Sequence, residues 1–354
     1  MSLIDVVVPA HDPDRPLTRA VGSALRNSEV RVSVVAHNCG SAAIAASLGE
    51  LADDPRVRVL EFNDGIGSPA GPVNFGIQQA TGPWISRLDS DDELFDGALD
   101  SWRAQATSYK AEIVLAQRVI DQKYHESLRR RAWRRHRLSL VGDGVFYATA
   151  PFGLMARAAI ERSAAAMTVG LPTGEDLRFT LALYSQARGI ELGARQAAYI
   201  LHTDQAVRAT TVARPLRELI GAAADAAASP QFTELQGSTK RAAATAITRV
   251  HVLARLSVAG VQQADDDELA MLAECIQNLG GTGLRRLGAL SRHEFALCLA
   301  AAQGSRSDLI RECGQPIDRQ DRWLTQQPSR LLGADAPLRW ALSRTAMEKA
   351  PLER

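Results

Sequence analysis

The chain has 354 residues, of which 46% are hydrophobic and 23% charged, and 41 Lys and Arg residues almost balance 40 Asp and Glu residues. This is an ordinary globular composition with room for two domains, and a net charge of +1 gives no global attraction to nucleic acid. Because no run of about 18 apolar residues occurs, the sequence predicts no transmembrane helix.

The first part of the chain alternates between β-branched runs and helical patterns of apolar residues. We expect strands at Ile4–Val8, Val30–Val35, Arg56–Phe62, Trp84–Leu88 and Ile113–Ile120. We expect helices between them, at 14–25, 42–51, 73–80 and 98–107. This order predicts βαβ units and a mainly parallel sheet, whose ligands bind at the carboxyl ends of its strands.

The pattern changes twice further along the chain. Residues 121–143 break the alternation and contain the run RRRAWRRHR, Arg129–Arg137. From about Arg214 the chain is rich in Ala and Leu. We expect its helices near 215–228, 237–259, 265–279 and 291–303. The sequence therefore predicts an α/β domain over 1–212 and an all-helical domain over 213–354.

The cysteines and the N-terminus indicate a cytoplasmic protein. Cys39, Cys275, Cys298 and Cys313 include no C-x-x-C pair, so their spacing fits neither a zinc site nor a dense disulfide framework. Free thiols in a reducing compartment are the simplest interpretation. The opening MSLIDVVVPAHDPDRP lacks a basic start and a cleavage site, so we expect a core strand there and not a signal peptide.

Four carboxylates stand where the fourth expected strand ends, in the segment RLDSDDELF. Alternation along Asp89-Ser90-Asp91 separates two acidic side chains, so that one can reach a sugar hydroxyl while the other binds a divalent metal. We favour nucleotide and metal for this pair because ligands of α/β sheets bind at strand ends. Asp92 and Glu93 are expected mainly to charge the first turn of the next helix, where carboxylates are stabilising.

Four segments in order resemble family 2 glycosyltransferases with a GT-A fold. VVVPAHDPDRPLTRAVGSALRN resembles the family's opening strand and helix, and RLDSDDELF resembles its strand-end D-x-D motif. TGEDLRFTLAL, Thr173–Leu183, resembles the downstream Glu-Asp motif, and YILHTDQAVRAT, Tyr199–Thr210, resembles a later segment with a histidine at a strand end. The resemblance covers about residues 1–210 and implies a mainly parallel, mixed sheet flanked by helices, which the helical domain follows here.

The resemblance implies an inverting enzyme that moves a sugar from a nucleotide-diphospho-sugar, with a UDP-sugar expected, to a hydroxyl of a glycan, a glycolipid or another cell-envelope polymer. Asp176 would be the general base for the acceptor hydroxyl, and Glu175 would steady that base or contact the sugar. Asp91 and His202 would bind Mn²⁺ or Mg²⁺, which neutralises the charge that develops on the diphosphate. The residues implied in nucleotide-sugar binding are Pro9, Ala10, His11, Asn38, Asn74, Asp89 and Ser90.

Some positions depart from the family's pattern. His11 stands where an aromatic residue is usual, Asn38 where an acidic residue contacts the base, and Val73 where an Arg is common. These departures leave the base preference and the diphosphate contact open. Without the resemblance, Glu175 and Asp176 would be interpreted as a plain helix start, with carboxylates facing the positive end of the helix dipole.

Two other functions remain open. A metal-dependent nucleotidyltransferase also uses a strand-end acidic pair, although the chain shows no basic Gly-rich phosphate loop. A non-catalytic module that binds nucleotide-sugars agrees with the departures at Asn38 and Val73. The presence of Asp91, Asp176 and His202 argues against such a module.

Three segments admit several interpretations. Gly65–Pro72 fits equally a backbone that approaches a phosphate and a plain turn. The Arg129–Arg137 run fits a solvated face, a peripheral contact with the inner face of an anionic membrane through Trp133, or a grip on a phosphorylated acceptor. Nucleic acid is the least favoured partner because the run lacks interleaved stacking aromatics. The C-terminal helices fit a homo-oligomer interface, an acceptor platform or simple support.

Overall fold

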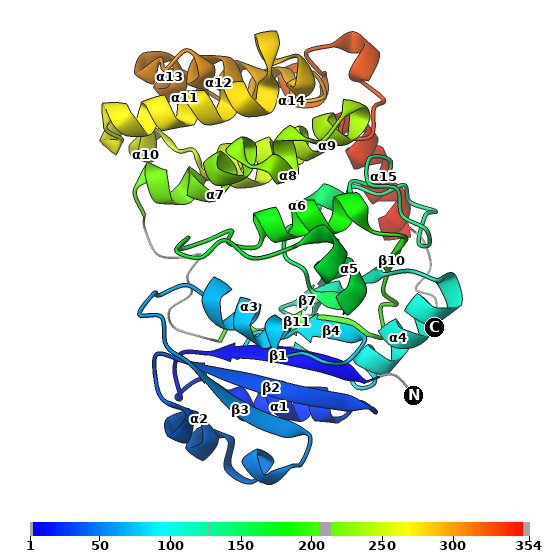
Figure 1. Cartoon of the computed structure of the whole chain (residues 1–354). Helices are drawn as coiled ribbons and strands as arrows, with labels where there is room; N and C mark the ends of the chain where they lie inside the picture. Colours follow the sequence, from blue (N-terminus) through cyan, green and yellow to red (C-terminus); the bar gives the residue numbers. More distant parts are fainter. Residues whose placement is uncertain (1–2, 127, 205–213, 350–354) are drawn as a thin grey trace. The chain divides into compact units, whose positions relative to one another are not determined.

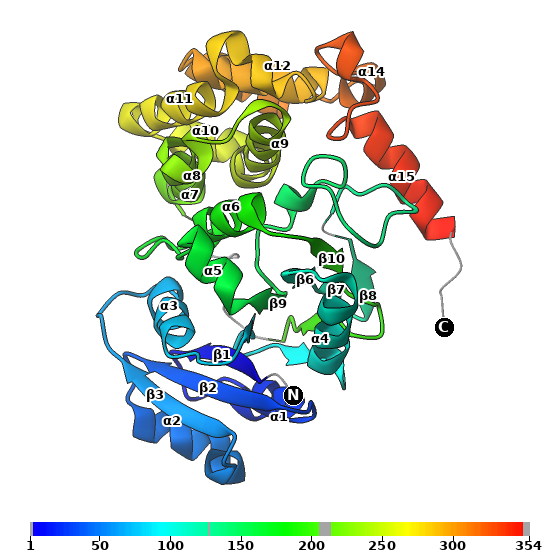
Figure 2. The ribbon, with the colours of Figure 1, turned by 45° about the vertical axis from the view of Figure 1, so that its right-hand side comes forward.

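The computed structural model describes residues 3–126, 128–204 and 214–349, with side chains up to residue 345 (Figures 1 and 2). The chain forms two compact units. Unit 1 is Met1–Ser127, Arg135–Leu138 and Ala150–Thr210, and unit 2 is Leu128–Arg134, Ser139–Thr149 and Thr211–Arg354. Unit 2 thus contains two short segments from within the range predicted for the α/β domain. The predicted boundary between residues 212 and 213 lies outside the described residues.

In the described part of the chain, unit 1 is built on a seven-stranded sheet with the order β10-β6-β9-β4-β1-β2-β3. Its strands are β1 (Ile4–Ala10), β2 (Val30–His37), β3 (Val57–Phe62), β4 (Trp84–Arg87), β6 (Ile113–Leu115), β9 (Gly153–Ala156) and β10 (Ile190–Leu192). Only β9 runs antiparallel to its neighbours, β4 and β6. Every residue of β1 is buried, as a central parallel strand requires. The prediction of a mainly parallel, mixed sheet is confirmed.

Helices cover both faces of this sheet. They are α1 (Leu17–Leu25), α2 (Ser41–Leu48), α3 (Ala70–Gln78), α4 (Ala98–Tyr109), α5 (Arg157–Ser163) and α6 (Leu177–Gln186), with a 3₁₀ turn η1 (Gly49–Asp53) after α2. Figure 1 shows α1 and α2 on one face of β1–β3 and α3 on the other. Helix α3 approaches β1 so closely that a Cβ at Gly76 would lie 2.3 Å from Cγ1 of Val7. Glycine at this position therefore lets α3 lie directly on the central strand.

A second sheet of unit 1 has four strands in the order β5-β11-β7-β8. They are β5 (Glu93–Leu94), β7 (Gln117–Ile120), β8 (Lys123–His125) and β11 (Ala198–Leu201). The prediction of one strand over 113–120 is wrong, because the chain changes sheets at Ala116, whose N–H donates to the Phe152 carbonyl at 3.0 Å. Since only Ala116 separates β6 from β7 and no Gly or Pro interrupts residues 113–120, the sequence gives no sign of this change.

Unit 2 is helical, as predicted for the C-terminal part of the chain. Its helices are α7 (Leu216–Ala228), α8 (Pro230–Thr233), α9 (Gly237–Ile247), α10 (Val258–Gln263), α11 (Asp266–Gly280), α12 (Arg292–Ala302), α13 (Arg306–Gly314), α14 (Arg319–Trp323) and α15 (Pro337–Lys349). Its shorter turns are η2 (Val145–Tyr147), η3 (Thr248–Val252), η4 (Leu253–Arg255), η5 (Thr282–Leu287) and η6 (Pro328–Arg330). The single helix predicted over 237–259 is wrong, since α9 passes into a π turn at Thr248 and the chain breaks again before α10.

That π turn carries Arg249, which is buried in the middle of unit 2. Its Nε and one NH₂ group donate to both carboxylate oxygens of Glu294, at 2.8 and 2.9 Å. Its other NH₂ group donates to the Tyr147 hydroxyl at 2.7 Å and to the Asp335 carbonyl at 2.6 Å. Burial opposes the charge, but Tyr147 and Glu294 outweigh it and raise the pKa of Arg249. One guanidinium therefore connects η2, η3, α12 and the segment before α15.

Several arginines of the Arg129–Arg137 run make contacts within unit 2. Arg129 lies over the Tyr147 ring, with 4.5 Å from its guanidinium carbon to the ring centroid. Arg130 donates to main-chain carbonyls of the run itself, and Arg131 pairs with the buried Asp143 at 2.7 Å. Trp133 is 80% exposed. These contacts show that part of the run is structural, and the membrane contact predicted for it stays a prediction.

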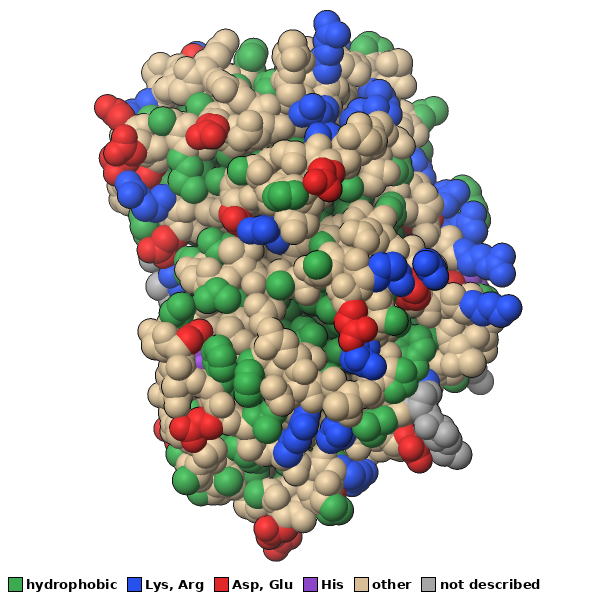
Figure 3. Space-filling model, viewed as in Figure 1, with side chains coloured by type: hydrophobic (Ala, Val, Ile, Leu, Met, Phe, Trp, Pro, Cys, Tyr) green, Lys and Arg blue, Asp and Glu red, His purple; other side chains and the backbone are tan. Residues whose placement is uncertain are grey.

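The surface charges, the cysteines and the lengths of the helices complete the description of the fold. Figure 3 shows acidic and basic side chains interspersed over much of the face that it draws. The four cysteines are free thiols. Among the described residues, no helix is both long and apolar enough to cross a lipid bilayer.

Candidate active site

The acidic segment forms a tight turn between two strands of different sheets. Strand β4 ends at Arg87, and the chain turns through Asp89–Asp92, where the Asp92 N–H donates to the Asp89 carbonyl at 3.1 Å. Glu93 then begins strand β5, and α4 starts only at Ala98, after Gly97 in the left-handed conformation. The prediction that Asp92 and Glu93 charge the first turn of the next helix is therefore wrong.

Asp92 is instead a buried acceptor at the centre of a hydrogen-bond network. Its two oxygens accept from the Tyr199 hydroxyl at 2.9 Å and from the His202 N–H at 3.0 Å. The Tyr199 hydroxyl also accepts from the Asp89 N–H at 2.9 Å, while its ring stacks on Phe152 with 4.2 Å between centroids. Burial, and then the charges of neighbouring carboxylates, raise the pKa of Asp92 to about 7. The network holds the strand-end turn against β11.

Asp91 faces helix α1. Its Oδ2 lies 2.8 Å from the Arg15 guanidinium, and its carbonyl accepts from Arg19. Arg19 also pairs with Asp204 at 2.6 Å, at the end of the described part of the segment after β11. Arg15 thus neutralises the Asp91 carboxylate, while Arg19 holds the main chain of the turn against α1.

Glu175 and Asp176 stand at the start of α6. Asp176 is the residue before the helix, and its side chain makes no capping hydrogen bond. The buried Arg87 guanidinium donates from Nε to Oδ1 of Asp89 at 2.8 Å and lies 3.5 Å from Oε1 of Glu175. One cation of β4 therefore touches the acidic turn on one side and the Glu-Asp pair on the other.

The pKa of Asp176 is strongly shifted. The carboxyl is partly exposed, yet the protein atoms around it disfavour its charge, and the adjacent Glu175 carboxylate adds to this. Arg87 opposes the shift. The net effect raises the pKa of Asp176 to about 8, within the range expected of a general base that works near neutral pH.

Of the residues predicted for the nucleotide-sugar, four lie at or just after the carboxyl ends of the first two strands: Pro9, Ala10, His11 and Asn38. Pro9 and Ala10 end β1 and pair with the last part of β2. His11 follows in an exposed position, and crowding by protein atoms and the charge of Arg15 lower its pKa. Asn38 follows β2 with a φ of 58°, which is the left-handed conformation. The sheet edge predicted to bind the nucleobase is thus built from these two strand ends.

Asn38 organises the loop before α3. Its Oδ1 accepts from the Gly65 N–H at 3.1 Å, and its Nδ2 lies 3.1 Å from Nε2 of His37. His37 in turn pairs with Asp64 at 2.8 Å, a partner that spacing did not suggest. The Gly65 N–H is committed to the loop, as the turn interpretation of Gly65–Pro72 requires.

Asn74 lies on α3 and is fully engaged with the chain before α6. Its amide accepts from the Met167 N–H and donates to the Met167 carbonyl, both at 2.9 Å. Ser68, in the preceding loop, donates to the Leu171 carbonyl at 3.0 Å. These bonds fix the segment that leads to Glu175 and Asp176 against α3.

Among the described residues, no group of three or more His, Cys, Asp or Glu side chains could hold a metal ion alone. Asp91 nevertheless offers hard carboxylate oxygens, and Mg²⁺ commonly completes such a coordination with substrate phosphates. The His202 ring instead faces Glu93, with 3.1 Å from Nε2 to Oε2. Asp91 therefore fits a metal shared with a diphosphate, and the assignment of His202 as a metal ligand stays a prediction.

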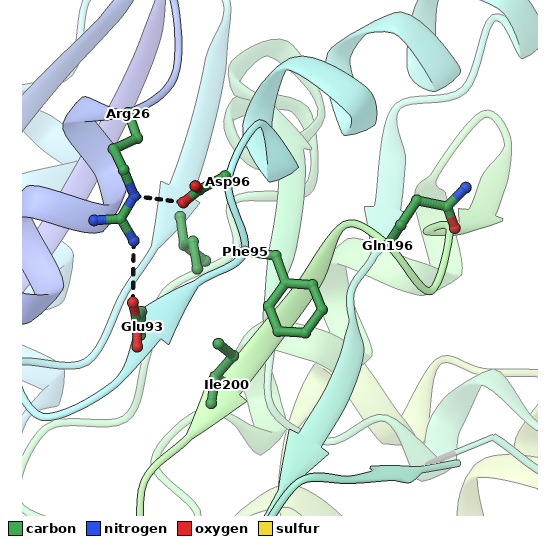
Figure 4. Close-up of a pocket in the computed structure, with 7 residues that line it drawn as sticks. Arg26, Glu93, Phe95, Asp96, Gln196 and Ile200 are labelled. Carbon is green, nitrogen blue, oxygen red and sulfur yellow. Dashed lines mark hydrogen bonds and ion pairs between the residues drawn. The ribbon is translucent and has the colours of Figure 1, made fainter. Parts of the chain in front are cut away.

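A separate pocket of about 400 Å³ lies beside β5 and β11 (Figure 4). Leu94, Phe95 and Ile200 give it apolar walls, and Gln196 also lines it. Arg26 reaches Glu93 at 3.0 Å and also pairs with Asp96 at its rim. None of the residues predicted for the nucleotide, the metal or the base lines this pocket.

Sequence reasoning missed three side chains of the site. They are Arg87, Tyr199 and Arg15, together with the buried role of Asp92. A charged residue inside the apolar run WISRL was a usable signal for Arg87, because an Arg in a central strand needs a buried counter-charge. Tyr199 and Arg15 carried no such signal, since their partners lie far away in the chain.

Comparison with known proteins identifies relatives of part of the chain. Residues 5–165 match the family model described as "Glycosyl transferase family 2". The succinoglycan biosynthesis protein ExoO of Rhizobium meliloti (strain 1021) is 35% identical over 112 residues, 32% of this chain and 32% of ExoO. Glycosyltransferase GlyG of Streptococcus pneumoniae serotype 4 (strain ATCC BAA-334 / TIGR4) is 30% identical over 118 residues, 32% of this chain and 38% of GlyG. The chain thus spans about a third of the length of each relative.

Solved structures are similar over most of the chain. The crystal structure of S. aureus TarS 1–349 in complex with UDP-GlcNAc matches with a TM-score of 0.74 and 17% identity, covering 88% of this chain and 90% of that chain. The complex of the same protein with UDP matches with a TM-score of 0.72 and 17% identity, covering 90% and 95%. At this identity the likeness shows the fold, and it confirms the prediction of a GT-A sheet followed by a helical region.

Proposed function

We propose that this protein, whose residues 5–165 match the model of glycosyl transferase family 2, is an inverting glycosyltransferase with a nucleotide-diphospho-sugar donor. The observation that carries the proposal is the shared contact of Arg87 with Asp89 and Glu175. It brings the strand-end carboxylates, which suit a donor, next to Asp176, which suits a base. A displacement at an anomeric carbon needs a donor site and a base next to each other.

In the proposed reaction, the acceptor hydroxyl attacks the anomeric carbon while Asp176 takes its proton. The bond between that carbon and the diphosphate oxygen breaks, and its electron pair leaves with the nucleoside diphosphate. Attack on the face opposite the leaving group inverts the configuration. Asp176 must be ionised to act, so its raised pKa makes the reaction favour neutral to alkaline pH.

The leaving diphosphate needs positive charge around it. Asp91 would hold Mn²⁺ or Mg²⁺, which supplies charge stabilisation to the leaving group when bound. Arg15 already lies 2.8 Å from Asp91, so a guanidinium stands beside the same place. Asp89 would position the ribose, and Pro9, Ala10, His11 and Asn38 would line the nucleotide. These assignments rest on their positions at neighbouring strand ends.

A UDP-sugar is the proposed donor, and a polysaccharide or another cell-envelope glycan is the proposed acceptor. The first part is supported by the likeness to TarS, whose structures contain UDP-GlcNAc and UDP. The second part is supported by ExoO, named for succinoglycan biosynthesis.

The proposal is tested with UDP-GlcNAc and a panel of other nucleotide-sugars, with and without Mn²⁺. Bound donor should raise the melting temperature of the wild type, and slow donor hydrolysis or transfer should release a nucleoside diphosphate. Asp176→Asn should keep the donor-induced shift and lose the release. Release of pyrophosphate would indicate a nucleotidyltransferase instead, and the absence of any donor-induced shift would refute donor binding.

A further inference from the structure

Arg87 is buried at the end of a central strand, with 8% of its side chain exposed. Removing a guanidinium from water costs several kcal/mol unless carboxylates and hydrogen bonds compensate for it. The buried position directly before the acidic turn therefore tolerates an arginine only because specific partners compensate for its charge. Those partners come from two different parts of the site.

The partners of Arg87 surround its guanidinium on several sides. Nε donates to Asp89 at 2.8 Å, and an NH₂ group lies 3.5 Å from Glu175. The other NH₂ group contacts the Met167 sulfur at 3.8 Å, and the guanidinium lies 5.9 Å from the centroid of the Phe152 ring. Because the donors of a guanidinium form a rigid planar fork, the direction of one carboxylate constrains the direction of the other.

We propose that Arg87 is a positioning residue that couples the donor half of the site, through Asp89, to the base half, through Glu175 and Asp176. The inference rests on the proposed transferase function for its catalytic meaning. It assigns Arg87 no contact with the reacting atoms. Its action is to align the two carboxylate pairs and to supply the positive charge that they share.

The charges around Asp176 give this inference a measurable consequence. Glu175 lies beside it in the chain, Arg87 and Asp89 face it from the β4 end, and Tyr184 faces it from α6. Burial and Glu175 raise the pKa of Asp176, whereas Arg87 lowers it. Removing the cation leaves three carboxylates facing one another, so Asp176 retains its proton and cannot accept one from the acceptor. Removing the Glu175 charge has the opposite effect.

The test compares the pH dependence of kcat/KM for four proteins: wild type, Arg87→Gln, Glu175→Gln and the double variant. The acidic limb is the part of the profile in which kcat/KM rises with pH as Asp176 loses its proton. In Arg87→Gln we expect this limb to move up by about one pH unit or more, so that activity falls about tenfold at pH 7 and recovers at higher pH. In Glu175→Gln the limb should move down. In the double variant, which loses one cation and one anion, it should return toward the wild-type position.

Arg31→Gln is the matched control. Arg31 is a strand arginine of the same sheet that pairs with the buried Asp5 at 2.7 Å, near the start of β1, away from the acidic turn at the other end. This variant should leave the limb in place. Arg87→Lys keeps the charge but lacks the planar fork, so it should keep the limb and lower kcat. A uniform loss of activity in Arg87→Gln, with no shift of the limb and no rescue in the double variant, would overturn the inference.

A second readout does not depend on transfer. In protein labelled with ¹³C at aspartate carboxyls, the Asp176 resonance is identified by its absence from Asp176→Asn, and its titration is followed directly. Arg87→Gln should move that titration upward, and an unmoved titration would refute the coupling. If the wild type releases no nucleoside diphosphate from any donor, the proposed function fails, while this titration still decides the role of Arg87.

Discussion

Unit 2 contains two Arg–Glu pairs whose arginines differ in burial. Helices α11 and α12 both begin with a capping box, in which Glu268 or Glu294 is the third helical residue. Arg217 binds Glu268 with 51% of its side chain exposed, whereas Arg249 binds Glu294 with 5% exposed. Glu268 is 6% exposed and Glu294 25%, so replacing each arginine by Met compares the loss of an exposed guanidinium with the loss of a buried one.

Arg249→Met should lower the free energy of unfolding by about 3–5 kcal/mol, the usual cost of removing one partner of a buried pair. The change leaves both Glu294 oxygens without the guanidinium and takes the donor from the Tyr147 hydroxyl. Arg217→Met should cost less than about 1 kcal/mol. Glu268 keeps the main-chain N–H groups of Asp265 and of residue 217 as donors, and the guanidinium that is lost was exposed to water.

The measurement is urea denaturation of the whole chain followed by circular dichroism, with the slope of each transition compared between variants. The double variant Arg249→Met/Glu294→Gln should recover part of the loss, because it removes the uncompensated charge. Equal costs for the two single variants would refute the reasoning from burial. A cost for Arg249→Met below about 1 kcal/mol would refute it as well.

Three further outcomes follow from the candidate site. Tyr199→Phe removes the donor to Asp92 and should lower the free energy of unfolding by about 1–3 kcal/mol in thermal or urea denaturation; an unchanged midpoint would contradict the network. Arg15→Met should strengthen Mn²⁺ binding about tenfold in an electron paramagnetic resonance titration with UDP present, because a competing cation leaves Asp91; weaker binding would show that the guanidinium supports the ligand. The wild-type kcat/KM should rise about tenfold per pH unit up to about pH 8 and level off above it, since Asp176 acts deprotonated and its pKa is raised to about 8; a flat profile between pH 6 and 8 would exclude it as the base.

The α/β part of the fold could be predicted from local sequence patterns, because strands and helices differ in the period of their apolar residues and the site lies at strand ends. The burial of β1 and the helical spacing of α1 are visible in the order of apolar residues, and the carboxyl end of β4 is visible in RLDSDDELF. Where two strands follow one another with a single residue between them, as β6 and β7 do, period alone misleads. The same is true at Thr248, where a helical pattern continues through a π turn.

The amino-acid sequence by itself determined that Asp89 and Asp91 follow the end of a strand and that Glu175 and Asp176 precede a helix, since those positions follow from the apolar patterns of β4 and α6 and from family motifs. Only the tertiary structure decided what each carboxylate contacts. Asp92 became a buried acceptor of Tyr199 instead of a helix start, and Arg87 became the common partner of Asp89 and Glu175. The physical reason is that burial and ion pairing depend on groups distant in the chain, which no local period records.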